Sequence, residues 1–150
     1  MQTEDRMPVD GAQLWTLNQR LLAVVMDACT EELTELGLET KEFFVLAEVE
    51  ASPYPAEIAT ALLLPKASVT VYVRNLVAKG FIRREIDEAD LRRHRLALTD
   101  EGRTARDRAL AALAAEYDRR LARVTPQDRV ELQRILAAML DLPEITSSPS

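Results

Sequence analysis

Residues 55–99 constrain the possible fold more than any other stretch, because two hydrophobic periodicities follow one another there. Apolar residues first recur at helical spacing, with a break after Leu64 and an end at Gly80, a residue that accepts the left-handed backbone found just past a helix. From residue 81 to 98 the pattern alternates as strands do, around a polar tip at 87–93. The stretch predicts two short helices joined by a tight turn and followed by a β-hairpin, which is a winged helix-turn-helix.

Amphipathic helices are predicted on both sides of this stretch. Apolar residues at steps of three and four indicate one long helix over 10–37, for which Asp10 is a suitable N-cap. Thr40 is the expected cap of a shorter helix, Thr99 opens another long one, and Thr125 interrupts that one before the last helix. The chain is thus expected to be mainly α-helical, with a small β-hairpin wing.

The apolar stripes of the terminal helices, over 10–37 and 109–142, are too extensive for the winged helix-turn-helix region at 40–108 to cover. Burial contributes ~25 cal/mol per Å² of apolar surface, so leaving these stripes in water is costly. We therefore expect a homodimer, in which these segments are N- and C-terminal dimerisation helices. A monomeric bundle packed on itself is the alternative. Either way, residues 1–150 are expected to form a single domain.

Composition excludes several classes of protein. A length of 150 residues and an apolar share of 47% suit one globular domain. No apolar run approaches the ~20 residues that span a membrane, and the polar, acidic N-terminus is unlike a secretory signal. A single cysteine cannot form an internal disulfide, so we expect a cytoplasmic protein without a membrane partner. Segments 1–9 and 146–150 are expected to lack regular structure.

The charge is unevenly distributed. A net charge of −6 opposes nucleic-acid binding if taken alone, because DNA binding draws on Lys and Arg at phosphates. Residues 1–65 carry 3 basic and 12 acidic side chains, whereas residues 66–108 carry 11 basic and 7 acidic ones, net +4. Exposed charges more than ~10 Å apart are screened, so this local basic region can still attract phosphate. A solvated charged surface without a partner is the alternative interpretation.

Three tracts resemble the MarR-type (multiple antibiotic resistance) regulators: L-V-A-K-G-F-I-R-R at 76–84, D-L-R-R at 90–93 and L-A-L-T-D-E-G-R at 96–103. The resemblance extends from about Leu14 to Leu140. It implies a homodimer whose first and last helices interlock, and whose recognition helices and wings enter neighbouring major and minor grooves of a pseudo-palindromic operator. Most members repress transcription, and many release double-stranded DNA when a small aromatic or phenolic effector binds.

By this resemblance, the recognition helix corresponds to residues 66–79. Helical spacing turns Val69, Tyr72, Val73 and Leu76 towards the core. The outer face, expected to bind DNA, consists of Lys66, Ala67, Ser68, Thr70, Val71, Arg74 and Asn75. Hydroxyl and amide groups there can bond base edges or phosphates, small apolar groups can contact thymine methyls, and the two cations suit phosphate. The family often carries a polar or basic side chain where Val71 stands, so the base preference departs from the family's.

The wing tip supplies three further expected DNA-binding residues. Arg92 matches the arginine that family members insert into the minor groove, where a narrow A·T tract concentrates negative potential. Asp90 is expected to fix the hairpin or to orient an arginine; the alternative is that it is simply a turn-forming residue. Arg93 is expected to reach phosphate. Of Arg83 and Arg84, one is expected to face DNA and the other a carboxylate.

Other side chains are candidates for an effector pocket, because such pockets are apolar with few polar groups. They are Trp15, Arg20, Met26, Phe43, Phe44 and Tyr54. For the aromatic residues, a place in the hydrophobic core is the alternative, and Arg20 could instead cross a dimer interface. Cys29 allows a redox-sensing interpretation, but its position on the apolar stripe favours a buried inert thiol. His94 has no Cys or His beside it, which argues against a metal site.

These features favour a dimeric, sequence-specific DNA-binding transcriptional regulator, and the resemblance implies that it is a repressor. Two alternatives are a winged-helix protein-protein interaction module without DNA binding and a cysteine-based redox-sensing regulator. We expect no enzyme and no cofactor, because we find no nucleophile with a base, no metal-ligand cluster and no glycine-rich phosphate loop.

Overall fold

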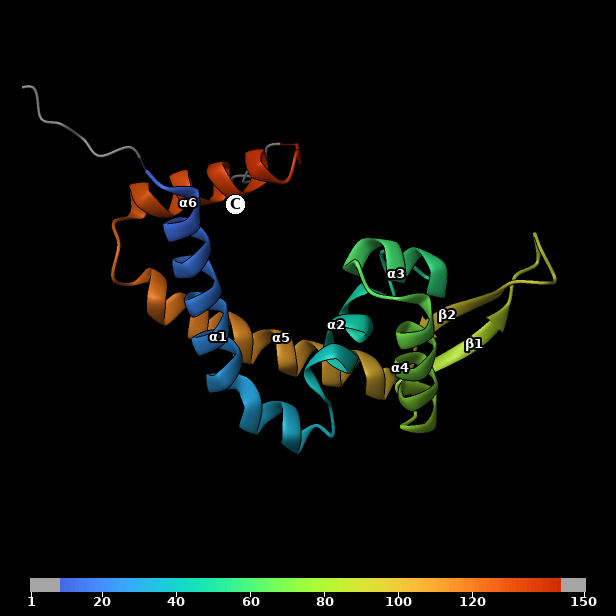
Figure 1. Cartoon of the computed structure of the whole chain (residues 1–150). Helices are drawn as coiled ribbons and strands as arrows, with labels where there is room; N and C mark the ends of the chain where they lie inside the picture. Colours follow the sequence, from blue (N-terminus) through green and yellow to red (C-terminus); the bar gives the residue numbers. More distant parts are fainter. Residues whose placement is uncertain (1–8, 144–150) are drawn as a thin grey trace, which may run out of the picture. The chain divides into compact units, whose positions relative to one another are not determined.

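The computed structural model describes residues 9–143, so the expectations for 1–8 and 146–150 lie outside the described residues. Within that range the chain is mainly helical with one antiparallel hairpin, as predicted (Figure 1). The elements are α1 (Gly11–Glu35), α2 (Thr40–Glu48), α3 (Pro55–Leu62), α4 (Lys66–Ala78), β1 (Ile82–Ile86), β2 (His94–Leu98), α5 (Asp100–Leu121) and α6 (Pro126–Met139). The described residues divide into two compact units, which meet between Leu113 and Ala114, inside α5.

The core of the first unit lies where α2, α3, α4 and the base of the hairpin meet. Its largest fully buried side chains include Phe43, Leu46, Ile58, Leu76 and Ile82. On α4, Val69, Val73 and Leu76 are buried and Tyr72 packs against them, which confirms the predicted core side of that helix. Within residues 9–143, no single helix is long and apolar enough to span a membrane. Together α3 and α4 have the length and composition of a membrane span, but the pair is bent by 118°. The apolar sides of both helices lie in this core.

Local sequence signals set most helix ends. Asp10 caps α1 by accepting a hydrogen bond from the N–H of Ala12 at 2.9 Å. The predicted cap of α2 is wrong by one residue: Glu39 is the N-cap and forms a capping box with Glu42, while Thr40 is already helical. Gly80, after α4, has the left-handed φ of +77° that the sequence predicted.

The turn between α3 and α4 uses a left-handed residue that is not glycine. Leu63 has φ +53° and is 90% exposed, so its side chain avoids the core while its backbone reverses the chain. The N–H of Leu64 then donates to the carbonyl of Ala59 at 3.0 Å, which closes the end of α3. This tight reversal sets the two helices of the helix-turn-helix at their sharp angle.

The Leu-Thr-x-x-Gly motif, residues 98–102 of the third tract, joins the end of α4 to the start of α5. The Thr99 hydroxyl donates to the carbonyl of Gly80 at 2.5 Å, and its oxygen accepts the N–H of Gly102 at 3.0 Å, so Thr99 caps α5 as predicted. Gly102 packs directly on the backbone of Phe81: a Cβ at this position would lie 1.9 Å from the Phe81 carbonyl oxygen. The motif is therefore a packing junction.

In the second unit, Thr125 and Asp128 form a capping box at the start of α6, as the Thr-Pro signal predicted. Arg129 Nε donates to the carbonyl of Leu121 at 3.0 Å, which closes the turn between α5 and α6. Tyr117, Leu121, Leu132 and Leu136 line a groove of about 320 Å³ between these two helices.

Candidate nucleic-acid interface

The outer face of α4 presents the residues that the sequence assigned to it. Lys66, Ala67, Thr70, Val71 and Arg74 are exposed, and Ser68 and Asn75 are half-buried at its edges. The Thr70 hydroxyl donates to the carbonyl of Lys66 at 3.0 Å, which leaves its oxygen lone pairs free to accept. Val71 is 46% exposed at the centre of this face and gives it an apolar patch.

The wing is a short hairpin with a structured tip. Its strands pair Ile82 with Leu98 at the base and Ile86 with His94 at the end. At the tip, Asp90 Oδ1 accepts the N–H of Arg92 at 3.0 Å and its carbonyl accepts the N–H of Arg93 at 2.9 Å. These are the contacts of a turn-forming aspartate. The Arg92 side chain has no hydrogen-bond or ion-pair partner within the described residues, and it is exposed at the tip.

Arg83 and Arg84 lie on opposite faces of β1. Arg83 Nε donates to Glu85 at 2.9 Å and its Nη1 to the carbonyl of Leu98 at 3.3 Å, so Arg83 is the arginine that faces a carboxylate. Arg84 is exposed opposite Leu96. Its contact with DNA stays a prediction.

Arg93 has partners within the protein, which the sequence did not suggest. Its guanidinium carbon lies 3.7 Å from the centre of the Tyr54 ring and its Nη2 lies 3.8 Å from Glu57. Tyr54 in turn donates its hydroxyl hydrogen to Asp87 Oδ2 at 2.5 Å. This bond lowers the pKa of Asp87, helped by the N–H of Ala89, and raises the pKa of Tyr54.

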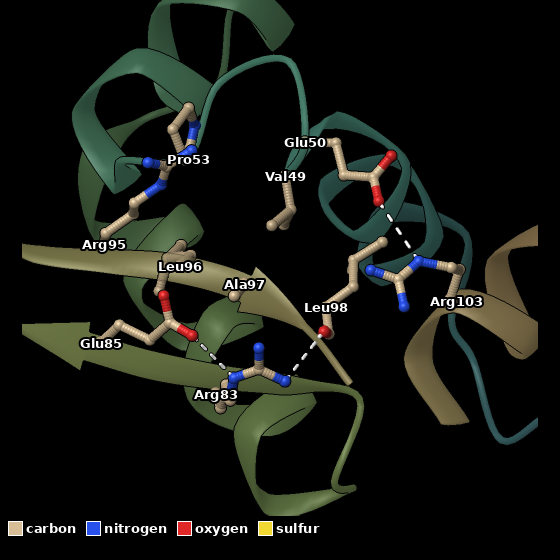
Figure 2. Close-up of a pocket in the computed structure, with 10 residues that line it drawn as sticks. All are labelled: Val49, Glu50, Pro53, Arg83, Glu85, Arg95, Leu96, Ala97, Leu98 and Arg103. Carbon is tan, nitrogen blue, oxygen red and sulfur yellow. Dashed lines mark hydrogen bonds and ion pairs between the residues drawn. The ribbon is translucent and has the colours of Figure 1, made fainter. Parts of the chain in front are cut away.

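A cavity of about 200 Å³ lies between the hairpin and the segment that precedes α3 (Figure 2). Three arginines line it, and carboxylates hold two of them: Arg83 pairs with Glu85, and Arg103 lies 3.5 Å from Glu50. Glu50 also accepts from Arg106 at 2.7 Å, which lowers the pKa of Glu50. Charges here are thus satisfied mainly by one another, and they tie the start of α5 to the end of α2.

The candidate effector residues occupy different environments. Phe43 is 2% exposed in the core, and Met26 packs against that core. Phe44 is 38% exposed, with its ring centre 5.7 Å from that of Phe43. Tyr54 is engaged by Asp87 and Arg93, as described above. Trp15 and Arg20 are exposed on α1.

Cys29 and His94 also have defined places. Cys29 is 2% exposed beside Val25 and Leu33 on the buried stripe of α1, as the sequence favoured. His94 is exposed at the start of β2. In the described part of the chain, no group of three or more His, Cys, Asp or Glu side chains is arranged to hold a metal ion.

Sequence reasoning missed the contacts that join distant segments. Lys79 Nζ lies 2.8 and 2.9 Å from the two carboxylate oxygens of Glu42 and 2.6 Å from the carbonyl of Gly37. This ion pair fastens the C-terminal end of α4 to the turn between α1 and α2. Its partners are 37 residues apart, so no local pattern could have indicated it.

A tight two-helix turn, an exposed second helix and an arginine-tipped hairpin define a winged helix-turn-helix protein. A profile of the MarR family matches residues 36–93. The HTH-type transcriptional repressor Rv2887 of Mycobacterium tuberculosis is 35% identical over 130 residues, which cover 85% of this chain and 93% of that relative. The chain belongs to the MarR family.

Solved structures of this family have the same fold. Rv2887 in complex with salicylic acid is 30% identical with a TM-score of 0.66, and covers 82% of this chain and 93% of its own. Rv2887 in complex with DNA is 28% identical with a TM-score of 0.67, and the match covers 84% of this chain and 96% of the Rv2887 chain. A MarR family transcriptional regulator from Silicibacter pomeroyi has a TM-score of 0.70 at 27% identity, and the match covers 87% of this chain and 90% of that regulator. The winged helix-turn-helix fold is thereby confirmed.

Proposed function

We propose that this chain is a dimeric, sequence-specific DNA-binding repressor that a small aromatic or phenolic molecule releases from its operator. The observation that carries the proposal is the exposed face of α4 beside a wing whose Arg92 has no internal partner. The DNA complex of Rv2887 supports it. We propose a non-enzymatic role in the cytoplasm, supported by the repressor name of the relative.

The base-contacting set is the outer face of α4 together with the wing. Ser68, Thr70 and Asn75 offer hydrogen-bonding groups to base edges, and Ala67 and Val71 offer contact to thymine methyls. Lys66 and Arg74 suit phosphate. At the tip, Asp90 shapes the turn that presents Arg92 to the minor groove.

Dimerisation is supported by apolar side chains that remain exposed in each unit. On α1, Leu14, Trp15, Leu17 and Leu22 are more than half exposed. On α6, Val130 and Met139 are 68% and 75% exposed, and Leu140 at its C-cap is 68% exposed. Exposed apolar stripes of this kind mark an interaction site, and a second copy of the chain is the occupant we propose for them.

The effector proposal rests on the complexes of Rv2887 with salicylic acid and p-aminosalicylic acid. We propose that aromatic carboxylic acids of this size release the chain from DNA. Of the candidate residues, Trp15, Arg20 and Phe44 have the exposure that ligand contact requires.

Selection of bound duplexes from a random pool tests the function directly. We expect an imperfect palindrome with half-sites about one helical turn apart, which we call the selected operator. Affinity for it should fall by orders of magnitude between about 50 and 200 mM salt, and further on addition of salicylate. A protein-interaction module would select no sequence and show no salt dependence.

Arg92→Ala should weaken binding to the selected operator by ~1–3 kcal/mol, chiefly at A·T-rich flanks, because the minor groove loses its cation there. Titration of labelled duplexes with and without A·T flanks measures the effect. Lys41→Ala removes a positive charge from an exposed site on α2, outside the proposed DNA-contacting set, and should leave the affinity unchanged. Equal affinities for Arg92→Ala and the unaltered chain would remove the wing contact from the proposal.

A further inference from the structure

Asp87 and Arg93, the last backbone pair of the hairpin, hold their side chains against Tyr54 at the start of α3. The Asp87 N–H donates to the carbonyl of Arg93 at 3.1 Å, one step beyond the strand pair of Ile86 and His94. Asp87 accepts the Tyr54 hydroxyl hydrogen, and the Arg93 guanidinium stacks on the ring of the same tyrosine. We call Tyr54, Asp87 and Arg93 the wing latch.

Tyr54 is a rigid anchor for this latch. It is the N-cap of α3, and Pro55 occupies the first helical position, where the proline ring restricts the backbone. Glu57 in the first turn of α3 adds a long ion pair to Arg93, and since both side chains are half exposed, this pair alone is weak. Because α3 packs directly on α4, the latch fixes the position of the wing relative to the recognition helix.

Little else holds the outer part of the hairpin. From Arg83 to Arg95 every side chain except that of Asp87 is exposed, and an isolated two-stranded hairpin is marginally stable. A backbone hydrogen bond from Leu96 to the carbonyl of Pro53, at 2.7 Å, reaches no further than the middle of the strands, where Leu96 pairs with Arg84. A tip that is free in solution would have to be ordered on binding, which reduces affinity.

We infer that Tyr54 and Arg93 are positioning residues, which hold the wing where Arg92 can enter the minor groove while α4 occupies the major groove. The inference rests on the proposed DNA-binding function. It also assigns Arg93 a different role from the phosphate contact that the sequence suggested, because its guanidinium is directed at the protein. Arg92, one residue earlier, keeps the role of DNA ligand.

Salt dependence separates a positioning residue from a phosphate ligand, because each cation at a phosphate contributes about one unit to the slope of log K against log salt. We expect Arg93→Met and Tyr54→Phe each to weaken binding to the selected operator about 3- to 10-fold with the slope unchanged. Arg74→Met, at a proposed phosphate ligand on α4, should reduce the slope by about one unit. The same reduction in Arg93→Met would show that Arg93 contacts phosphate and would overturn the inference.

A double variant tests whether the two residues act together. Tyr54→Phe combined with Arg93→Met should weaken binding less than the product of the single effects, because both changes open one latch. Arg84→Met is the matched control, since it removes the same charge from an exposed site of the same hairpin outside the latch, and its effect should multiply with that of Tyr54→Phe. If the double variant instead lost affinity by the full product of the two single effects, Tyr54 and Arg93 would act independently, which would contradict a shared latch.

A measurement without DNA keeps the latch separate from the proposed function. In the free protein, Tyr54→Phe should make amide hydrogen exchange about 3- to 10-fold faster over residues 86–94 and leave the core amides unchanged. Unaltered exchange over 86–94 would overturn the latch. If the unaltered chain bound no duplex, the DNA-binding proposal alone would fail, and hydrogen exchange would still decide whether the latch exists.

Discussion

Gly102→Ala is expected to lower the free energy of unfolding by roughly 3 kcal/mol, at the upper end of what overpacking costs. A Cβ at this position would lie 1.9 Å from the carbonyl oxygen of Phe81 and 2.7 Å from its carbonyl carbon. These are backbone atoms, so no side chain can rotate away. Either α5 moves away from the end of α4, or the hydrogen bonds that Thr99 makes to Gly80 and Gly102 are lost.

Thermal unfolding measures this change, with the two proteins compared at equal concentration because a dimer's stability depends on it. For a chain of this length the melting temperature should fall by about 6–12 °C. Gly11→Ala is the matched control: Gly11 also lies in the first turn of a helix, but nothing lies within 4 Å of its added Cβ. Equal melting temperatures for Gly102→Ala and Gly11→Ala would show that the junction is not tightly packed.

Periodicity predicted the elements because it depends on neighbours along the chain. The strands Ile82–Ile86 and His94–Leu98 and the helix ends at Asp10, Gly80 and Thr125 follow from patterns within a few residues. The error at Thr40 has the same origin. The run Glu39-Thr40-Lys41-Glu42 offers two possible caps, and the capping box that forms between Glu39 and Glu42 decides between them.

Contacts between distant segments could not be predicted in this way. The Leu-Thr-x-x-Gly motif carried the family resemblance, yet the reason for its glycine is the backbone of Phe81, which lies earlier in the chain. Arg93 was placed with Arg92 as a DNA ligand because the two are adjacent and equally charged. Only the fold shows that Tyr54, on another element, engages one of them.

Lys79 is a further residue whose main contacts are distant in sequence, and we expect its loss to destabilise the protein strongly. Its positive charge suits the negative C-terminal end of α4. In the fold, its ammonium group is the counter-charge of Glu42, which is 1% exposed, and it also donates to the carbonyl of Gly37. The one group thus fastens the end of the recognition helix to the turn after α1.

Lys79→Met is therefore expected to lower the free energy of unfolding by roughly 3 kcal/mol, because it leaves the Glu42 carboxylate buried without a counter-charge. We place the cost at the lower end of the range for a broken buried pair, since the Lys79 side chain is itself 35% exposed. Urea unfolding measures the change. Lys66→Met makes the same substitution at an exposed site on the same helix and should stay within about 0.5 kcal/mol.

A double-mutant cycle with Glu42→Leu tests whether the unpaired Glu42 carboxylate is what destabilises Lys79→Met. Once the carboxylate is gone, Lys79→Met no longer leaves a buried charge, so the double variant should be more stable than Lys79→Met alone. If Glu42→Leu and Lys79→Met destabilised the protein additively, the ion pair would contribute nothing as a pair, and the end of α4 would be held by the junction at Thr99 and Gly102 instead.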